Sequence, residues 1–264
     1  MQKISSAYAI ILVLISGTSY AMPIWAKPAA IANSITDRWE VQIFAPPPLP
    51  DNGAPTGRPR GAAGRGNNCA LEPPLTALVP TTEQPLGKEQ RKVTYVWGKT
   101  VAEYPTFWFY VPYSRVSLRS MEFVLQDAED NNVYQTPVKL PEIPGVVSLR
   151  LPSTSTPLKL GKMYHWFFKT KVDCDAQKPS GVEDYVEGWV QRVPLSPTLA
   201  RQLEIATPQQ RLTIYAANGI WYEALTTLAE LRLVTPKDAT LNAKWAKLLQ
   251  SAGLADIASK PIVP

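Results

Sequence analysis

The sequence predicts an α+β protein in which an antiparallel β-sandwich is followed by a small helical domain. Two patterns carry this prediction. Short β-rich runs separated by turn residues fill residues 69–193, and apolar residues recur at three- and four-residue spacing through residues 194–264. The first pattern is typical of paired strands and the second of amphipathic helices. We therefore expect a sandwich domain at 69–193 and a helical domain at 194–264.

The N-terminal residues 1–26 have the three-part pattern of a secretory signal peptide. Lys3 is followed by an apolar run at 7–15 and then by small residues, with cleavage expected after Ala21 or Ala26. The apolar run is too short for a membrane anchor, which needs about 20 residues. We expect an exported protein, periplasmic or extracellular, without a transmembrane span.

Residues 27–68 are predicted to form an arm or linker that precedes the sandwich. The chain has 26 prolines and 14 glycines, and several of them cluster in this stretch. The proline run at 46–50 favours an extended chain, and the Gly/Arg-rich run at 57–66 favours a flexible one. We therefore expect proteases to cut near Arg58, Arg60 or Arg65.

Eight short strands are expected in the sandwich domain. They lie at 75–79, 93–97, 106–111, 121–126, 133–136, 146–151, 163–170 and 186–192. This number of strands in about 125 residues favours an immunoglobulin- or fibronectin-like antiparallel sandwich. Leu158 lies six residues before Tyr164 at the start of a strand, a spacing that resembles the tyrosine corner of such domains.

The helical domain carries recognisable start and stop signals. Ser196 and Thr207 each precede a proline, which predicts two helix N-termini, and Gln210 completes a capping box for the second. Gly219 and Gly253 lie where left-handed C-terminal caps are expected. The apolar spacing also resembles one tetratricopeptide (TPR) unit, so we expect TPR-like helical hairpins.

Few residues suited to metal or nucleophilic chemistry are present. The chain has one histidine, His165, and two cysteines, Cys69 and Cys174. One chain therefore cannot assemble a His-rich zinc centre or a four-cysteine metal site, and we expect no metal, no cofactor and no catalytic residue. Because the protein is expected to be exported, we predict a Cys69–Cys174 disulfide, with two buried free thiols as the alternative.

Two groups of acidic residues raise the possibility of carboxylate catalysis, because two suitably spaced carboxylates suffice for glycoside hydrolysis. Both groups are expected at turns, where acidic residues are common for solvation and for Asx-type hydrogen bonds. The groups are Glu183, Asp184 and Glu187, and Asp127, Glu129 and Asp130.

Two expected strands carry aromatic residues on both faces. Alternation places Trp108 and Tyr110 on one face of the strand at 106–111, and His165 and Phe167 on one face of the strand at 163–170. A second large apolar face must be covered or used for binding. These four residues are therefore candidates for an interface or a ligand platform, and we favour cover of Trp108 and Tyr110 by the C-terminal helices.

Several motifs together resemble the secreted cyanobacterial domain-of-unknown-function family 928. They lie at 75–80, 105–113, 122–127, 144–152, 164–168, 188–192 and 219–224, the last reading Gly-Ile-Trp-Tyr-Glu-Ala. The resemblance covers residues 40–260 and implies an exported protein. It implies no activity and no site residues, because none are assigned in that family.

Charge narrows the range of partners. The formal net charge is +5, and the basic residues are not clustered as they are on a nucleic-acid-binding face, so we expect no nucleic-acid partner. The favoured function is an exported, non-catalytic interaction or adaptor protein of the cell envelope, with an envelope protein or an acidic polysaccharide as partner. The alternatives are a carbohydrate-binding module with exposed aromatic residues and a carboxylate-dependent glycoside hydrolase.

Overall fold

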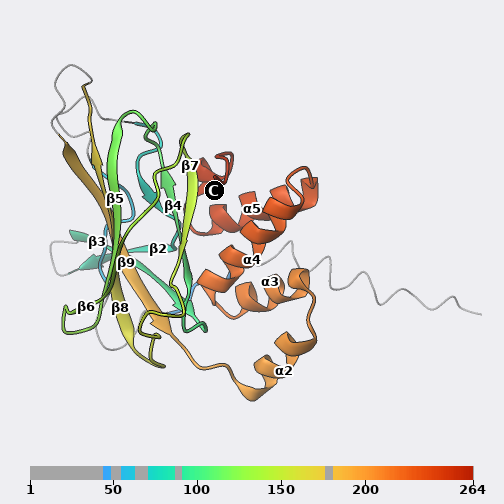
Figure 1. Ribbon diagram of the computed structural model, residues 1–264. Helices are drawn as coiled ribbons and strands as arrows, with labels where there is room; N and C mark the ends of the chain where they lie inside the picture. Colours follow the sequence, from blue (N-terminus) through green and yellow to red (C-terminus); the bar gives the residue numbers. More distant parts are fainter. Residues whose placement is uncertain (1–43, 49–54, 63–70, 87–90, 176–180, 264) are drawn as a thin grey trace, which may run out of the picture. The chain divides into compact units, whose positions relative to one another are not determined.

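The computed structural model describes residues 44–48, 55–62, 71–86, 91–175 and 181–263 (Figure 1). The strands of this part are β1 (Thr76–Ala77), β2 (Thr81–Leu86), β3 (Arg91–Thr100), β4 (Thr106–Val111), β5 (Leu118–Gln126), β6 (Asn132–Pro137), β7 (Gly145–Arg150), β8 (Met163–Val172) and β9 (Val182–Arg192). The helices are α2 (Pro197–Ile205), α3 (Pro208–Ala217), α4 (Trp221–Val234), α5 (Ala239–Ser251) and the short 3-10 helix η2 (Ala255–Ile257). The predicted α+β class is confirmed.

The described strands form two sheets. A large sheet has six strands in the order β2-β3-β9-β8-β5-β6, and a small sheet has three in the order β1-β4-β7. Each of the eight expected strands overlaps an observed one, and β2 is an addition that the sequence did not predict. Pro85 interrupts the strand pattern of β2 and is tolerated because β2 lies at the edge of the large sheet, where β3 is its described neighbour.

The large sheet is mixed, because one of its strand pairs runs parallel where the sequence predicted an antiparallel sandwich. β3 and β9 run parallel, with Trp97 opposite Trp189 and Thr100 opposite Arg192. Before Trp97 in β3 and Trp189 in β9, a segment of the predicted arm pairs with both strands. Thr56 there forms an antiparallel bridge with Tyr95 of β3.

This inserted segment, residues 55–62, links the two sheets. Arg58 forms a bridge with Glu187 of β9, and Arg60 forms one with Thr76 of the small sheet. A Cβ atom on Gly57 would lie 2.7 Å from the backbone oxygen of Glu187, so the close approach requires glycine. The expectation of a flexible chain is therefore wrong at Arg58 and Arg60, because their backbone pairs with strands.

The core between the sheets is rich in aromatic side chains. Phe109 of the small sheet stacks on Phe168 of the large sheet, with ring centroids 4.1 Å apart. Phe107 packs on Phe123 at 4.8 Å. These rings are almost fully buried, and the apolar area that they remove from water stabilises the contact between the sheets.

Two helix starts and two helix ends lie where the sequence predicts them. The Ser196 side chain accepts a hydrogen bond from the backbone of α2, and Thr207 and Gln210 form the expected capping box of α3. Gly219 and Gly253 both adopt positive φ, at 67° and 76°, as expected for left-handed caps. In Figure 1 the helices lie on the side of the small sheet that faces away from the large one.

The N-terminus of α4 contacts both sheets. Trp221 Nε1 donates to the backbone oxygen of Leu78 at 2.8 Å. The Tyr222 hydroxyl accepts from Trp166 Nε1 at 3.0 Å and donates to the backbone oxygen of Trp189 at 3.2 Å. Burial raises the pKa of Tyr222 above its usual value. This helix end is therefore fixed to the inner side of the fold.

The chain returns to the small sheet after η2. Ile262 forms a parallel bridge with Val146 of β7, and Val263 donates from its backbone to the Val146 oxygen at 2.9 Å. Among the described residues, no helix is both long enough and apolar enough to span a bilayer.

Candidate functional site on the open sheet face

The four aromatic candidates separate into a covered pair and an open pair. Trp108 is 3% exposed, and its Nε1 donates to Thr226 Oγ1 of α4 at 2.9 Å. Tyr110 is 5% exposed, with Lys260 Nζ 5.6 Å from its ring centroid. Because both rings are buried, neither offers a face on which a ligand could stack.

His165 and Phe167 lie on the outer face of the large sheet and keep partial exposure. This outer face, carried by β5, β8 and β9, is here called the open face. Outward residues of β8 alternate with the buried side chains of Trp166 and Phe168. No described helix packs on this part of the sheet, and its Lys169 and Tyr185 side chains are exposed.

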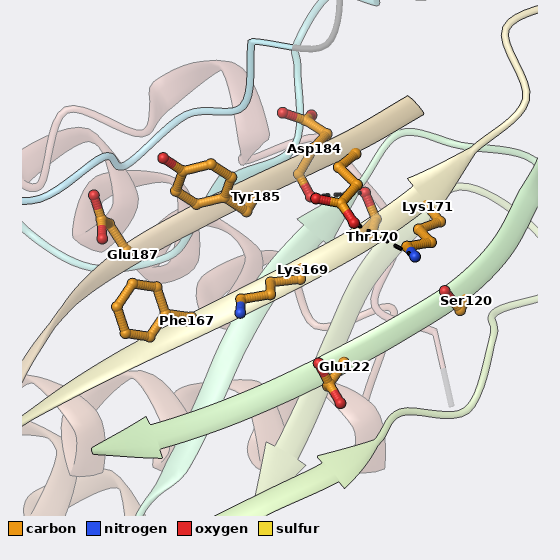
Figure 2. A pocket seen from close by; sticks show the side chains of 10 residues that line it. Ser120, Glu122, Phe167, Lys169, Thr170, Lys171, Asp184, Tyr185 and Glu187 are labelled. Carbon is orange, nitrogen blue, oxygen red and sulfur yellow. Dashed lines mark hydrogen bonds and ion pairs between the residues drawn. The ribbon is translucent and has the colours of Figure 1, made fainter. Parts of the chain in front are cut away.

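A shallow groove of about 460 Å³ runs across the open face (Figure 2). Its outward-facing lining combines aromatic rings with charges of both signs, contributed by three neighbouring strands. The residues are Ser120 and Glu122 of β5, Phe167, Lys169 and Lys171 of β8, and Glu183, Tyr185 and Glu187 of β9.

Ring contacts hold one end of this surface in place. The His165 and Trp189 rings are stacked, with centroids 4.3 Å apart and an interplanar angle of 5°. His165 also contacts Phe167 at 4.1 Å, and its Nε2 lies 3.2 Å from Glu187 Oε2. Trp189 Nε1 donates to the Thr56 oxygen of the inserted segment at 2.9 Å. The rings thus form a fixed row.

Charged groups lie beside the rings. The Arg58 guanidinium lies 4.4 Å from the Tyr185 ring centroid, and Lys169 Nζ lies 5.5 Å from that of Phe167. Lys171 forms an exposed ion pair with Glu183 at 3.4 Å. Exposed pairs of this kind contribute little to stability, so these charges remain available for hydrogen bonding to a ligand.

A buried carboxylate fixes the inserted segment beneath the groove. Asp184 is 1% exposed and accepts hydrogen bonds from the Tyr113 hydroxyl at 2.7 Å and the Ala62 backbone at 2.8 Å. Arg58 Nη2 lies 3.4 Å from the same carboxylate. Burial, followed by the hydrogen bond to Asp184, raises the pKa of Tyr113. Asp184 therefore positions Arg58, which in turn covers Tyr185.

The acidic groups differ from expectation in one case. Glu183, Asp184 and Glu187 lie on a strand and not at a turn, because β9 begins at Val182. Alternation then directs Glu183 and Glu187 to the open face and Asp184 inward. The three carboxylates therefore do not act as one cluster.

The second acidic group forms the expected turn. Asp127 Oδ1 accepts from the backbone N–H groups of Glu129 at 3.0 Å and Asn131 at 2.9 Å. These hydrogen bonds lower the pKa of Asp127, with the bond from Asn131 the largest cause. This is Asx-type bonding within an exposed loop.

The remaining predicted site residues are the two cysteines. Cys174 is half-buried and packs against the core after β8, whereas Cys69 lies outside the described residues. Their pairing therefore stays a prediction. In the described ranges, no three His, Cys, Asp or Glu side chains are grouped so that they could hold a metal ion.

The sequence interpretation missed much of the groove. Tyr185, Lys169 and Lys171 were not among its candidates, and Arg58 was assigned to a spacer. A signal for the lysines was present, because they alternate with buried residues at the end of β8. Arg58 had no local signal, since its position depends on a pairing with residues far away in the sequence.

Comparison with known proteins gives a family without an assigned activity. No curated protein matches the chain. A family model described as Domain of Unknown Function (DUF928) matches residues 60–262, which include every described strand and helix. Since this match covers well over half of the residues, the chain belongs to the DUF928 family.

Proposed function

We propose that this protein is an exported, non-catalytic binding protein that holds an envelope partner on its open face. The observation that carries the proposal is the groove across β5, β8 and β9, where the Phe167 and Tyr185 rings lie beside charges of both signs. The Phe167 ring contacts His165, which is stacked on Trp189. Aromatic residues in partly desolvated positions commonly dominate binding energy at interfaces. Neighbouring charged groups then orient the partner.

The carboxylates of the groove support binding better than hydrolysis. Glu187 Oε2 lies 3.2 Å from His165 Nε2, and Glu183 forms an ion pair with Lys171, so each carboxylate lies against a side chain of the neighbouring strand. A hydrolase would need one carboxyl group as an acid and another as a nucleophile or base on opposite sides of the scissile bond. The contacts of Glu183 and Glu187 with neighbouring side chains support a binding role for these two groups.

A second candidate function, binding of a polysaccharide, is favoured by the chemistry of the same groove. Phe167 and Tyr185 offer apolar ring surface, and Tyr185 is 36% exposed. Lys169 and Glu122, which are cross-strand neighbours, can donate to and accept from sugar hydroxyls. An acidic polysaccharide would bind to the lysines, and a neutral polysaccharide would form hydrogen bonds with groups of both charges.

Export and an immunoglobulin-like architecture form part of the proposal. The pattern at residues 1–26 supports export, although these residues lie outside the described part. The Tyr164 hydroxyl accepts from the backbone N–H of Lys159 at 3.0 Å, which is the type of contact that a tyrosine corner makes. This contact supports the immunoglobulin-like assignment. The hairpin formed by α3 and α4 supports a TPR-like assignment for the helical part.

The test places a photoreactive amino acid at position 167 in the native envelope. We expect a cross-link to one partner, protein or polysaccharide, that is absent when the same group replaces Val116, which is 92% exposed in a turn. The Tyr185→Ala substitution should weaken that cross-link about tenfold or more, as for loss of an interface aromatic. Identical cross-linking at both positions, or no effect of Tyr185→Ala, would contradict the proposal.

A further inference from the structure

A second hollow lies on the helix side of the molecule, where the small sheet meets α3 and α4. Its volume is about 320 Å³, within the range of sites for small molecules. Its lining includes Arg150 at the end of β7, Arg211 of α3, Glu230 of α4 and the tyrosines Tyr104 and Tyr215. None of these residues belongs to the groove on the open face.

The two arginines of this cleft have no acidic partner among the residues that the structure describes. Neither Arg150 nor Arg211 forms an ion pair within the described part of the chain. Arg211 donates from Nε to the Leu203 oxygen at 3.1 Å, and its terminal nitrogens make no hydrogen bond to a described residue. Both arginines are exposed. Guanidinium groups bind planar carboxylates through two parallel hydrogen bonds. The cleft is therefore suited to an organic anion.

The inner wall holds an incompletely bonded carboxyl group. Glu223 Oε1 accepts from the Thr100 hydroxyl at 2.5 Å and from the backbone of Val101 and Ala102 at 3.1 and 3.0 Å. Glu223 Oε2 is buried and has no hydrogen-bond partner among the described residues. Burial raises the pKa of Glu223, which favours a protonated carboxyl that can donate. Buried polar atoms without partners are rare, so this oxygen marks the wall as polar and unsatisfied.

The tyrosines add neutral hydrogen-bonding capacity. The hydroxyls of Tyr104 and Tyr215 make no hydrogen bond within the described residues, and each can both donate and accept. Tyr215 lies close enough to Glu223 and Arg211 for both to influence its pKa, which burial raises most. The cleft therefore joins cations, phenols and carboxyl groups in one small volume.

We propose that this cleft binds a small hydroxylated carboxylate, of the chemical class of a sugar acid. Arg150 and Arg211 bind the carboxylate of the ligand. Tyr104, Tyr215 and Glu230 bind its hydroxyl groups. The proposal is independent of the function assigned to the open face, because the two sites share no lining residue.

The test titrates the full-length mature protein with glucuronate by isothermal titration calorimetry, with glucose and sulfate as comparison probes. We expect glucuronate to bind more tightly than either, because glucose lacks the charge and sulfate lacks the hydroxyls. Arg150→Gln should weaken glucuronate binding by about 10- to 100-fold, the effect of losing a charge-assisted pair. Arg201→Gln, on exposed α2, is the matched control and should leave binding unchanged.

Three outcomes would overturn the proposal. The first is no binding of glucuronate by the folded wild-type protein. The second is equal loss with Arg150→Gln and Arg201→Gln, or no loss with either. The third is sulfate binding as tight as glucuronate binding, which would indicate recognition of charge alone. Arg150 is exposed and makes no described hydrogen bond, so Arg150→Gln should fold, and an unchanged circular dichroism spectrum would confirm this.

Discussion

Strands β4 and β8 carry similar runs of aromatic residues but lie in different surroundings. From Phe107 to Val111 every residue of β4 is buried, because the large sheet covers one face and the helices cover the other. In β8 only alternate residues are fully buried. Charged residues distinguish the two strands in the sequence, because β4 has none and β8 places Lys169 and Lys171 on its outer face. Aromatic content alone therefore does not identify a binding face.

Removal of the helices should have the largest effect on this difference. A chain ending at Val193 would expose the outward side of β4, including Trp108 and Tyr110. Each uncovered ring would lose about 2 to 3 kcal/mol of the stabilising free energy that its burial contributes. We therefore expect binding of a hydrophobic dye, aggregation or unfolding. Dye fluorescence and light scattering measure this. A soluble, dye-negative chain as stable as the full protein would show that the helices do not stabilise β4.

The next largest effect is a difference in stability between single alanine substitutions in β4 and in β8. Trp108→Ala should lower the free energy of unfolding by about 3 to 5 kcal/mol, the usual cost of a large buried side chain, and it also removes the hydrogen bond to Thr226. Phe167→Ala should cost about 1 kcal/mol or less, since the ring is partly exposed and its neighbours can adjust. Equilibrium urea denaturation compares them. Equal losses would remove the distinction between the covered and the open strand.

The stability of the protein should depend on pH through Glu223, which lies on α4, one of the helices that cover the small sheet. Its pKa is raised above the ordinary 4.5 by burial, so above that pH the folded state binds more protons than the unfolded state. Stability of the wild-type protein should therefore fall as pH rises from 4.5 towards the folded pKa. Glu223→Gln, which cannot titrate, should show a flatter profile in urea denaturation over the same range.

The control for this pH effect is Glu230→Gln, because Glu230 is exposed on the same helix. Its profile should follow that of the wild type. A Glu223→Gln profile that is as steep as the wild-type profile would mean that another group causes the dependence.

The smallest effect on stability should come from Arg60, a partly exposed residue of the inserted segment. Arg60 forms a two-fold hydrogen-bonded pair with Asp256, at 2.6 and 2.8 Å, and these bonds lower the pKa of Asp256. Because the pair is partly exposed, Arg60→Ala should cost about 1 kcal/mol or less. The loss should be present above the ordinary pKa of 3.8 and should vanish as lower pH protonates Asp256.

A thermal denaturation series at several pH values can measure this difference, with Arg201→Ala as the control. A cost that persists unchanged in acid would show that Arg60 acts through packing and not through its charge.

The sequence was most informative where structure is local. Ser196 and Thr207 specify helix starts through contacts within one turn, and both were predicted correctly. The strand at Thr81–Leu86 was missed because Pro85 hides an edge strand whose pairing is decided by β3. Glu183 was placed in a turn because the length of β9 is set by its long partner β8.

The candidate site was predictable only in part, for the same reason. His165 and Phe167 could be found from alternation, and they do lie on the open face. Trp108 showed the same local pattern, and the cover by the C-terminal helices that we favoured for it comes from α4, more than a hundred residues later. Arg58 is held beside Tyr185 by Asp184, a contact between residues 126 positions apart. Such contacts leave no trace in a window of ten residues.

The return of the last described residues to the small sheet has a consequence for the order of folding. Val263 pairs with Val146, and the inserted segment needs β9 and η2 before Arg58 and Arg60 can find their partners. Contacts between residues so distant in sequence form late, because loop-closure entropy opposes them. These contacts are therefore expected to form after the rest of the fold, and a ribosome-bound chain that lacks residues 255–263 should leave those of Arg60 and Val263 unmade.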